Sequence, residues 1–275
     1  MIRSQQLFAS SLVRVLLHDH PPGSPHLDPL EEVADSHVIS FVTRGAFCLQ
    51  HGRRQWRFTP QVLLITRPGF AYRCHHEEIE PRDACLSIVC QPIAMARTSG
   101  ESGALIDSFV PVVALTSRLA YLRHRLLRAL ADDPEPLEVE SIATETAAAL
   151  SREPATSHSQ AQLDWYAQRV DAARDLFERT YAYSHSLGSV ARYVGMSPFH
   201  FNRVFRQLAG MPPHRYLMRV RMARAADRLL EGDSVTQAAL HTGHHNLSHF
   251  TRQFRSLHGV SPSRYARTNA RLSAC

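Results

Sequence analysis

The chain has 275 residues, 31 basic and 25 acidic side chains, and a formal net charge of +6. Its hydrophobic fraction of 44% and charged fraction of 20% are typical of folded globular proteins and exclude an intrinsically disordered chain. No apolar run reaches the roughly 20 residues of a membrane helix, the segment LFASSLVRVLL lacks a signal-peptide cleavage pattern, and an odd number of cysteines, five, argues against a secreted disulfide framework. We therefore expect a cytoplasmic protein without membrane contact, built from about two domains.

The charge is distributed unevenly along the chain. Residues 1–163 contain 15 Arg and 18 acidic residues, whereas residues 164–275 contain 16 Arg and 7 acidic residues. The two parts therefore carry formal charges of −3 and +9. This asymmetry predicts that only the C-terminal part contacts a polyanion.

Short apolar segments separated by turn residues predict a strand-rich N-terminal domain, either a small barrel or a sandwich. The segments are HVISFVTRG, FCLQHG, WRFTP, VLLITRPG, AYRCHH and ACLSIVC. The preceding stretch HDHPPGSPHLDPLEE is rich in Pro and His and predicts an extended arm or a first strand. Because histidines in flexible arms usually bind nothing specific, we expect no site at His18, His20 and His26.

Two amphipathic helices are predicted after these strands. Leucines recur at spacings of three and four from Leu115 to Leu130, and the pattern continues from Ile142 to Leu150 beyond the turn sequence DDPEP. The apolar stripe is expected to pack within the chain, and pairing with a second copy stays open as an additional role. The polar stretch REPATSHSQAQ then predicts a linker between domains.

A candidate metal site follows if AYRCHH and DACLSIVC pair as a hairpin. Cys74 then lies opposite Cys85, and His76 opposite Asp83, with all four side chains on one face. Two thiolates, an imidazole and a carboxylate suit a tetrahedral Zn²⁺. Two alternatives stay open: a thiol redox switch between the cysteines, and cysteines that are only small buried apolar residues.

A 49-residue internal repeat is the most specific feature of the C-terminal part. HFNRVFR, beginning at His200, returns as HFTRQFR at His249, and the match extends from Leu208–Tyr216 to Leu257–Tyr265. Each copy follows a short predicted helix and a glycine turn, which is the order of a helix-turn-helix unit. One supersecondary unit is therefore used twice.

The first recognition helix is expected to start at Ser197-Pro198, because the hydroxyl can accept an orphan amide and proline fits the first helical position. Helical spacing predicts a buried face made of Phe201, Val204, Phe205 and Leu208. The outward residues of this helix are Phe199, Asn202, Arg203 and Arg206, and those of the second are Leu247, Ser248, Thr251 and Arg252.

Each outward side chain of the first helix suits one kind of DNA contact. Arg203 matches a guanine edge and Asn202 an adenine edge. Phe199 matches a thymine methyl group, and Arg206 lies nearer the phosphates. For any of these residues, contact with phosphate or solvent alone stays open as the alternative.

Between the two units, residues 214–231 predict a helix of about 27 Å at 1.5 Å per residue. This length is near one turn of B-DNA. A rigid connector of that length suits two recognition helices in successive major grooves, roughly 34 Å apart.

Residues 165–267 resemble the DNA-binding domain of the AraC/XylS family of bacterial transcription regulators. The resemblance rests on SLGSVARYVGMSPFHFNRVFRQLAGMPPHRYL, on RMARAADRLLEGD, and on SVTQAAL, TG and SHFTRQFRSLHGVSPSRYAR. It implies seven helices with two helix-turn-helix units, and DNA contacts at the outward residues other than Arg206. After Gly243 the family usually has an aromatic residue, whereas this chain has His244 and His245. We therefore expect a second unit that is looser or reads DNA less strictly.

Many members of this family also resemble one another in an N-terminal cupin-like barrel that binds an effector or mediates dimerisation. Residues 30–95 are similar to this barrel in their order of strands and turns. The expected fold class is α+β: a cupin-like domain with a helical segment at 1–151, a linker at 152–163, and an all-α AraC-type DNA-binding domain at 164–275. The expected partners are duplex promoter DNA, a small-molecule effector, RNA polymerase and, as an open alternative, a second copy of the chain.

The expected function is effector-responsive activation of transcription, with repression and with metal or redox sensing through Cys74 and Cys85 as alternatives. A cupin-type enzyme needs two histidines one residue apart, together with a downstream carboxylate and histidine that line the barrel, and we identify no such complete set. His75 and His76 are neighbours and would point to opposite faces of a strand. A methyl-accepting DNA-repair protein needs a close CxxC pair, which the sequence lacks. An architectural DNA-binding protein would show affinity without sequence preference. We therefore expect no enzymatic activity.

Overall fold

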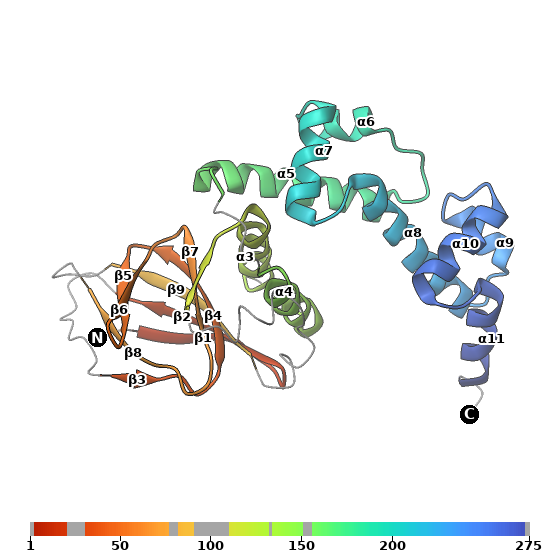
Figure 1. The fold of residues 1–275 in the computed structure, drawn as a ribbon. Helices are drawn as coiled ribbons and strands as arrows, with labels where there is room; N and C mark the ends of the chain where they lie inside the picture. The colour runs from red at the N-terminus through yellow and green to blue at the C-terminus, as the bar shows by residue number, and fades with distance from the viewer. Residues whose placement is uncertain are drawn as a thin grey trace. The chain divides into compact units, whose positions relative to one another are not determined.

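The computed structural model describes residues 3–20, 31–76, 82–90, 110–131, 134–150 and 156–272. The chain divides into two compact units, Met1–Asp164 and Trp165–Cys275. The first unit begins with strands and continues with helices, and the second is helical (Figure 1). The predicted α+β class, with a strand-rich N-terminal part and a helical C-terminal part, is confirmed. Among the described residues, none of the helices is long and apolar enough to cross a membrane.

Two antiparallel sheets form the N-terminal unit. Their strands are β1 (Arg3–Ala9), β2 (Val13–Asp19), β3 (Glu32–Val33), β4 (His37–Arg44), β5 (Phe47–His51), β6 (Arg54–Phe58), β7 (Val62–Thr66), β8 (Ala71–His75), β9 (Ala84–Cys90) and β10 (Val112–Ala114). The larger sheet has the order β1-β2-β9-β4-β7-β10, and the smaller has the order β3-β8-β5-β6. Val42 and Leu64 of the larger sheet share an apolar core with Phe47, Leu49 and Phe58 of the smaller one. The two sheets therefore face each other.

The opposite face of the larger sheet packs against two helices, α3 (Ser117–Ala129) and α4 (Pro136–Ala148) (Figure 1). Ile39 and Phe41 alternate with the inward residues of β4, so they point to this second face. They share a core with the predicted leucine stripe, of which Leu115, Leu119, Leu122 and Leu126 are buried. The packing of this stripe within the chain is thereby confirmed.

The predicted hairpin between AYRCHH and DACLSIVC is wrong. β8 pairs with β3 and β5, whereas β9 pairs with β2 and β4 in the other sheet. All residues of β9 are buried, while β8 has none in that class. A strand that is buried along its whole length is most stable in the middle of a sheet with both faces covered. For that reason β9 lies between β2 and β4, which are distant in sequence, and not beside β8, which precedes it in the chain.

Seven helices follow in residues 160–272. They are α5 (Gln160–Arg179), α6 (Leu187–Tyr193), α7 (Pro198–Ala209), α8 (Pro213–Leu230), α9 (Val235–His241), α10 (Leu247–His258) and α11 (Pro262–Leu272). The predicted linker 152–163 differs from the structure at its end, because α5 already begins at Gln160; residues 151–155 lie outside the described part. The connector α8 has 18 residues, or about 27 Å.

Side-chain caps define where the paired helices begin. Ser197 accepts the amide of His200 at 3.4 Å, as predicted, and Asn246 accepts that of His249 at 2.9 Å in the second unit. Ser186 and Ser234 each form a capping box at the start of α6 and α9. Each cap satisfies an amide that the helix itself leaves without a partner. The two units therefore use equivalent local signals.

The turn between α9 and α10 lies in close contact with the segment that joins α5 to α6. Gly243 has φ of 76°, and a Cβ added there would lie 2.5 Å from the carbonyl oxygen of Ala182. Gly195, in the equivalent turn of the first unit, also has a positive φ, but a Cβ there would meet nothing within 4 Å. The second turn thus requires glycine for space as well as for conformation.

We expect Gly243→Ala to destabilise the C-terminal unit more than Gly259→Ala. Both glycines have φ of 76°, so both changes force alanine into the left-handed region at about 1–2 kcal/mol. At Gly259 a Cβ meets nothing within 4 Å, whereas at Gly243 the close contact adds about 1–3 kcal/mol. Urea unfolding of both variants measures the difference, and equal losses would contradict the close contact.

Candidate functional site

The second helix of each repeat has one buried and one exposed face. Phe205 of α7 packs against Phe177 of α5 and Tyr216 of α8, with ring centroids 6.2 and 5.7 Å apart. Burial of large rings fixes the rotation of a helix about its axis. The predicted inward residues of α7, Phe201, Val204, Phe205 and Leu208, are all buried. In α10 the buried residues are Phe250 and Phe254, which occupy the positions of Phe201 and Phe205 in the repeat.

The exposed face of α7 carries the residues expected to read DNA. Phe199, at the start of the helix, is 81% exposed, which leaves a large apolar ring in water without support from the fold. Asn202, Arg203 and Arg206 are exposed on the same helix. A guanidinium nitrogen of Arg203 lies 3.0 Å from Nδ1 of His200 one turn earlier. This face therefore presents an apolar, an amide and two cationic groups to solvent.

The exposed face of α10 repeats part of this pattern. Arg252 occupies the position equivalent to Arg203, 49 residues later, and it is exposed. Leu247 and Ser248 are exposed at the start of the helix, whereas Thr251 is half-buried. The second face therefore has shorter side chains at two positions, with Ser248 and Thr251 where the first has Phe199 and Asn202.

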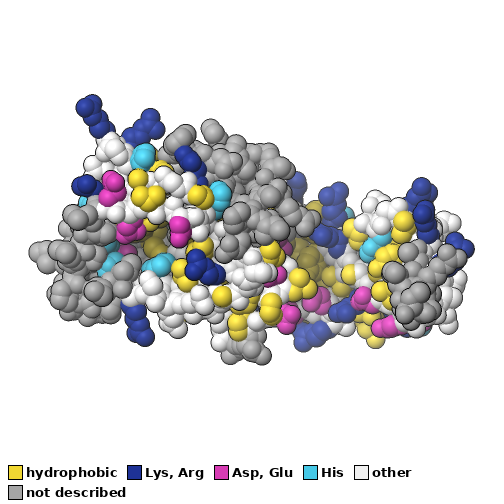
Figure 2. All heavy atoms as spheres, turned by 90° about the horizontal axis from the view of Figure 1, so that it is seen from below, with side chains coloured by type: hydrophobic (Ala, Val, Ile, Leu, Met, Phe, Trp, Pro, Cys, Tyr) yellow, Lys and Arg dark blue, Asp and Glu magenta, His cyan; other side chains and the backbone are white. Residues whose placement is uncertain are grey.

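The charge of the helical unit suits a polyanion. Arg side chains project from its surface (Figure 2), and residues 164–275 carry a formal charge of +9. Arg also presents a planar set of donors that matches phosphate and guanine. Electrostatic attraction would therefore bring duplex DNA to this unit before any base is read.

Arg221 of α8 joins the two repeats, and sequence analysis did not single it out. Its Nε and Nη2 donate to the carbonyl oxygens of Tyr181 and Tyr183 at 2.7 and 2.9 Å. Its Nη1 donates to the carbonyl oxygen of Gly243 at 3.3 Å. Its acceptors lie 22 to 40 residues away in sequence, so no local pattern distinguishes it from the other arginines of α8.

His244 occupies the interior position where the family usually has an aromatic residue. The residue is only 6% exposed, and the centroid of its ring lies 5.2 Å from that of the Phe250 ring. Its Nδ1 lies 3.2 Å from Oγ1 of Thr242, and Nε2 lies 3.4 Å from Sδ of Met218. Burial, followed by the charge of Arg221, lowers the pKa of His244 to about 4. A neutral imidazole therefore fills this position at neutral pH.

The N-terminal unit contains a cavity of about 440 Å³ between residues of both sheets. Leu16, Val38 and Leu64 supply apolar walls, while Arg14 and Ser87 are among its polar groups. In Figure 2, acidic and histidine side chains appear together on the viewed face of this unit. A cavity of this size and mixed polarity is suited to a small molecule.

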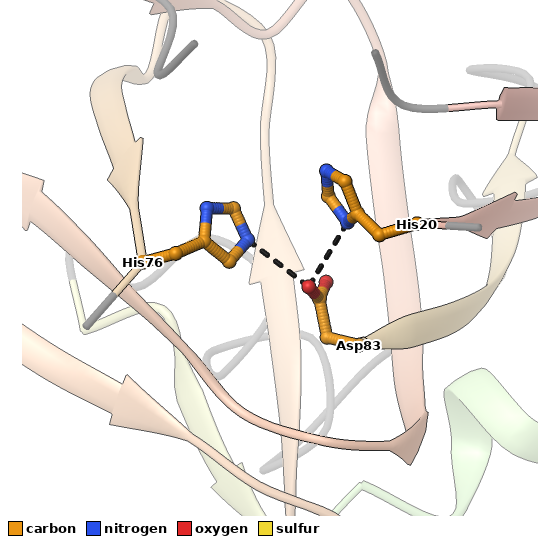
Figure 3. Close-up of side chains that lie close together, drawn as sticks. All are labelled: His20, His76 and Asp83. Carbon is orange, nitrogen blue, oxygen red and sulfur yellow. Dashed lines mark ion pairs between the residues drawn. The ribbon is translucent and has the colours of Figure 1, made fainter. Parts of the chain in front are cut away.

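Asp83 lies between two imidazoles that also line the cavity (Figure 3). Its Oδ1 is 2.9 Å from Nδ1 of His20 and 3.1 Å from Nε2 of His76. The three side chains are only 3 to 7% exposed. Burial acts to raise the pKa of Asp83, but the hydrogen bond from His76 and the charges of both histidines hold it below its ordinary value.

Three strand ends bring these groups together. His20 follows β2 and Asp83 precedes β9, and the amide of His20 donates to the carbonyl oxygen of Asp83 at 3.2 Å. This bond extends the ladder in which Asp19 pairs with Ala84. His76 follows β8 and so arrives from the smaller sheet.

The structure places the four residues predicted for a metal site differently from the expected hairpin. His76 and Asp83 are in contact, but Cys74 lies opposite Leu49, and Cys85 opposite His18 and Val42. Both cysteines line the cavity. Burial, followed by the charge of Asp83, raises the pKa of Cys85 to about 12, so its thiol stays protonated at neutral pH.

The third member of the buried cluster is His20, which the sequence placed in an arm expected to hold no site. Its position directly after the strand VRVLLHD was the only local signal that it belongs to a sheet. Two other histidines were considered with it. His18 lines the cavity, and His26 lies outside the described residues.

Comparison with known families matches residues 190–268 to a family described as "Helix-turn-helix domain". The match begins within α6 and extends into α11, so it includes both recognition helices. The C-terminal region therefore carries an AraC-type helix-turn-helix domain.

Individual proteins are similar to all or part of this chain. The uncharacterised HTH-type transcriptional regulator YbfI of Bacillus subtilis is 22% identical over 217 residues, which cover 78% of each chain. The bifunctional transcriptional activator/DNA repair enzyme Ada of Escherichia coli is 38% identical over 58 residues, which cover 21% of this chain and 16% of Ada. A transcriptional regulator from Chromobacterium violaceum with an AraC-type DNA-binding domain is 27% identical, covers 38% of this chain and 93% of its own, and has a TM-score of 0.36.

We expect His244 to make the stability of the C-terminal unit depend on pH. Its pKa is about 4 in the folded chain and has an ordinary value of 6.5 in the unfolded chain. As pH falls from 6.5 towards 4, the unfolded state takes up a proton that the folded state resists, so stability is lost over that window. Unfolding free energies measured by denaturant titration between pH 4 and 7 test this expectation.

His244→Phe keeps a buried ring and removes the titrating group, so its stability should change less with pH over this window. His245→Gln removes an exposed neighbouring imidazole whose charge is the smallest of the causes that lower the pKa of His244, so the profile should change only slightly. Parallel profiles for His244→Phe and the wild type would show that another group is responsible.

Proposed function

We propose that this chain, a DNA-binding transcription regulator of the AraC type, reads a bipartite DNA site and responds to a small molecule in its N-terminal cavity. The observation that supports bipartite reading is the equivalence of the exposed faces of α7 and α10. Arg203 and Arg252 occupy the same position of the repeat, and both are exposed. Two reading helices in one chain match two half-sites on one duplex.

The outward residues of α7 divide between bases and backbone. Arg203 is suited to the O6 and N7 acceptors of guanine, and Asn202 to the N6 and N7 groups of adenine. Phe199 gains a thymine methyl contact that removes its ring from water. Arg206 lies one turn further along the helix, nearer the phosphates.

The second reading face is expected to be less specific. Arg252 is its guanine-reading group, and Leu247 offers an apolar contact for thymine. Ser248 and Thr251 have short hydroxyl side chains that bond to several base edges and to phosphate. This half-site should therefore tolerate more sequence variation than the one bound by α7.

The connector α8 supports simultaneous binding of both half-sites. The connector is about 27 Å long, and one turn of B-DNA is roughly 34 Å. The two recognition helices would span the remaining length if they project beyond the ends of α8. Arg221 and the contact at Gly243 hold the two repeats together on this connector. Both recognition helices then enter successive major grooves on one face of the duplex.

Effector binding in the cavity is the proposed means of control. Its volume of about 440 Å³ falls within the range of small-molecule sites, about 300–1,000 Å³, and its walls combine apolar and charged groups. We expect the ligand-bound regulator to activate transcription through RNA polymerase in the cytoplasm. Transcription from a bound promoter, with and without candidate ligands, tests the control and its sign; a ligand-dependent fall would indicate repression.

Thiol redox sensing through Cys74 and Cys85 has less support. The cysteines lie on strands of different sheets, and Cys85 is buried with a raised pKa. A protonated buried thiol reacts slowly with oxidants, because the thiolate is the reactive form.

We expect Arg203→Ala and Arg252→Ala each to weaken binding to the specific site by about 1–3 kcal/mol, with relaxed base preference in different half-sites. The physical reason is the loss of a two-donor contact to one guanine. Binding to libraries in which each half-site is randomised measures both the affinity and the preference.

Arg206→Ala is the matched control, because it removes an exposed arginine from the same helix at the position assigned to phosphate. Its loss should be similar for all sequences, with a smaller dependence of affinity on salt. If Arg203→Ala and Arg252→Ala behave in this same uniform way, their assignment as base-reading residues is wrong.

A further inference from the structure

Side chains of metal-ligating types converge in the N-terminal cavity. The candidate ligand atoms of His20, His76 and Asp83 all lie within 4.8 Å of one another. The residues follow or precede three different strands, from two different sheets. Sequence proximity therefore does not account for their convergence, which Figure 3 shows around the carboxylate.

The separations are close to those of a coordination sphere. Bonds of about 2.0–2.2 Å to tetrahedral Zn²⁺ place its ligand atoms about 3.3–3.6 Å apart. The two nitrogen-to-oxygen distances are 2.9 and 3.1 Å, and no ligand pair is more than 4.8 Å apart. Small rotations of the three side chains would lengthen the two nitrogen-to-oxygen distances and bring the two ring nitrogens closer together. All three ligand atoms would then lie at separations that suit zinc.

Charge and burial also favour an ion over a purely structural cluster. Two imidazoles and a carboxylate are removed from water, and nitrogens of both rings approach the same oxygen. Buried charged groups often stabilise a fold less than apolar residues of similar volume would. A divalent cation coordinates neutral imidazoles and offsets the carboxylate charge, so it gives this arrangement a direct physical reason.

We propose that His20, His76 and Asp83 bind a divalent transition-metal ion, with Zn²⁺ as the best match, and leave its fourth position open to the cavity. Two imidazoles and one carboxylate form a common three-residue ligand set for zinc, with an exchangeable fourth ligand. Cys74 and Cys85 line the same cavity, but they are not ligands of this site.

The ion would join the two sheets. His76 belongs to the end of a strand in the smaller sheet, and the other two ligands belong to strand ends of the larger one. An ion that binds only the folded unit stabilises it, by an amount that rises with the logarithm of the ion concentration once this exceeds the dissociation constant. This consequence does not depend on DNA binding, so it can be measured separately from the proposed regulatory function.

The test is a titration of the full-length, metal-free chain with Zn²⁺, followed by calorimetry and by thermal unfolding. We expect one ion to bind in the N-terminal unit and to raise its unfolding temperature. His20→Gln, His76→Gln and Asp83→Asn should each weaken binding by roughly 100-fold or more, since each removes a direct ligand. His75→Gln is the matched control, because His75 is adjacent on β8 but lies 3.0 Å from Gln55 outside the cluster.

Co²⁺ provides a second measurement on the unaltered chain, so the result does not depend on how the variants fold. We expect visible absorption bands of a tetrahedral ion without an intense thiolate-to-cobalt band in the near ultraviolet. A thiolate band, or a loss of affinity in Cys85→Ser as large as in His20→Gln, would overturn the three-residue set. Failure of the wild type to bind Zn²⁺, or equal affinity in His76→Gln and His75→Gln, would overturn the site itself.

Discussion

Burial of paired aromatic rings is the constraint on which the helical unit depends. Phe201 and Phe205 of α7, like Phe250 and Phe254 of α10, are fully buried. Their burial stabilises the fold, by about 1.5–3 kcal/mol for each side chain. The same burial decides which residues cannot face inward. The reading surface therefore follows from the core: once the rings are packed, Arg203 and Arg252 must point away from it.

A chain with two such helices must also hold them in a fixed relation. Arg221 contributes by bonding to main-chain oxygens on both sides of α8, and Gly243 contributes by allowing a close approach to Ala182. His244 follows Gly243 in the chain and packs its neutral imidazole against Phe250, in the place of an aromatic ring. His244 thus fills the interior position of the second repeat. The expectation that this repeat is looser or reads DNA less strictly, drawn from His244 and His245, stays a prediction.

The sequence predicts the helical unit well because its determinants are local. Caps such as Ser197, glycine turns and the 3.6-residue period all act within a few residues, and the repeat supplies each of them twice. Strand pairing is different, because β9 takes partners that are far away in sequence, and alternation alone does not name them. The candidate metal set changed for this reason: His76 and Asp83 were found from their types and spacing, but His20 became their neighbour only through the pairing of β2 with β9.

The Arg221 contacts have a consequence for the DNA as well as for the protein. The guanidinium bonds to the segment before α6 and to the turn before α10, so it helps to hold the two recognition helices at a constant angle. One extra base pair between half-sites rotates the second by about 34° around the duplex axis, given about 10.5 base pairs per turn. Natural target sites should therefore be recognisable in a genome by a nearly constant spacing between two short motifs, even where the second motif is poorly preserved.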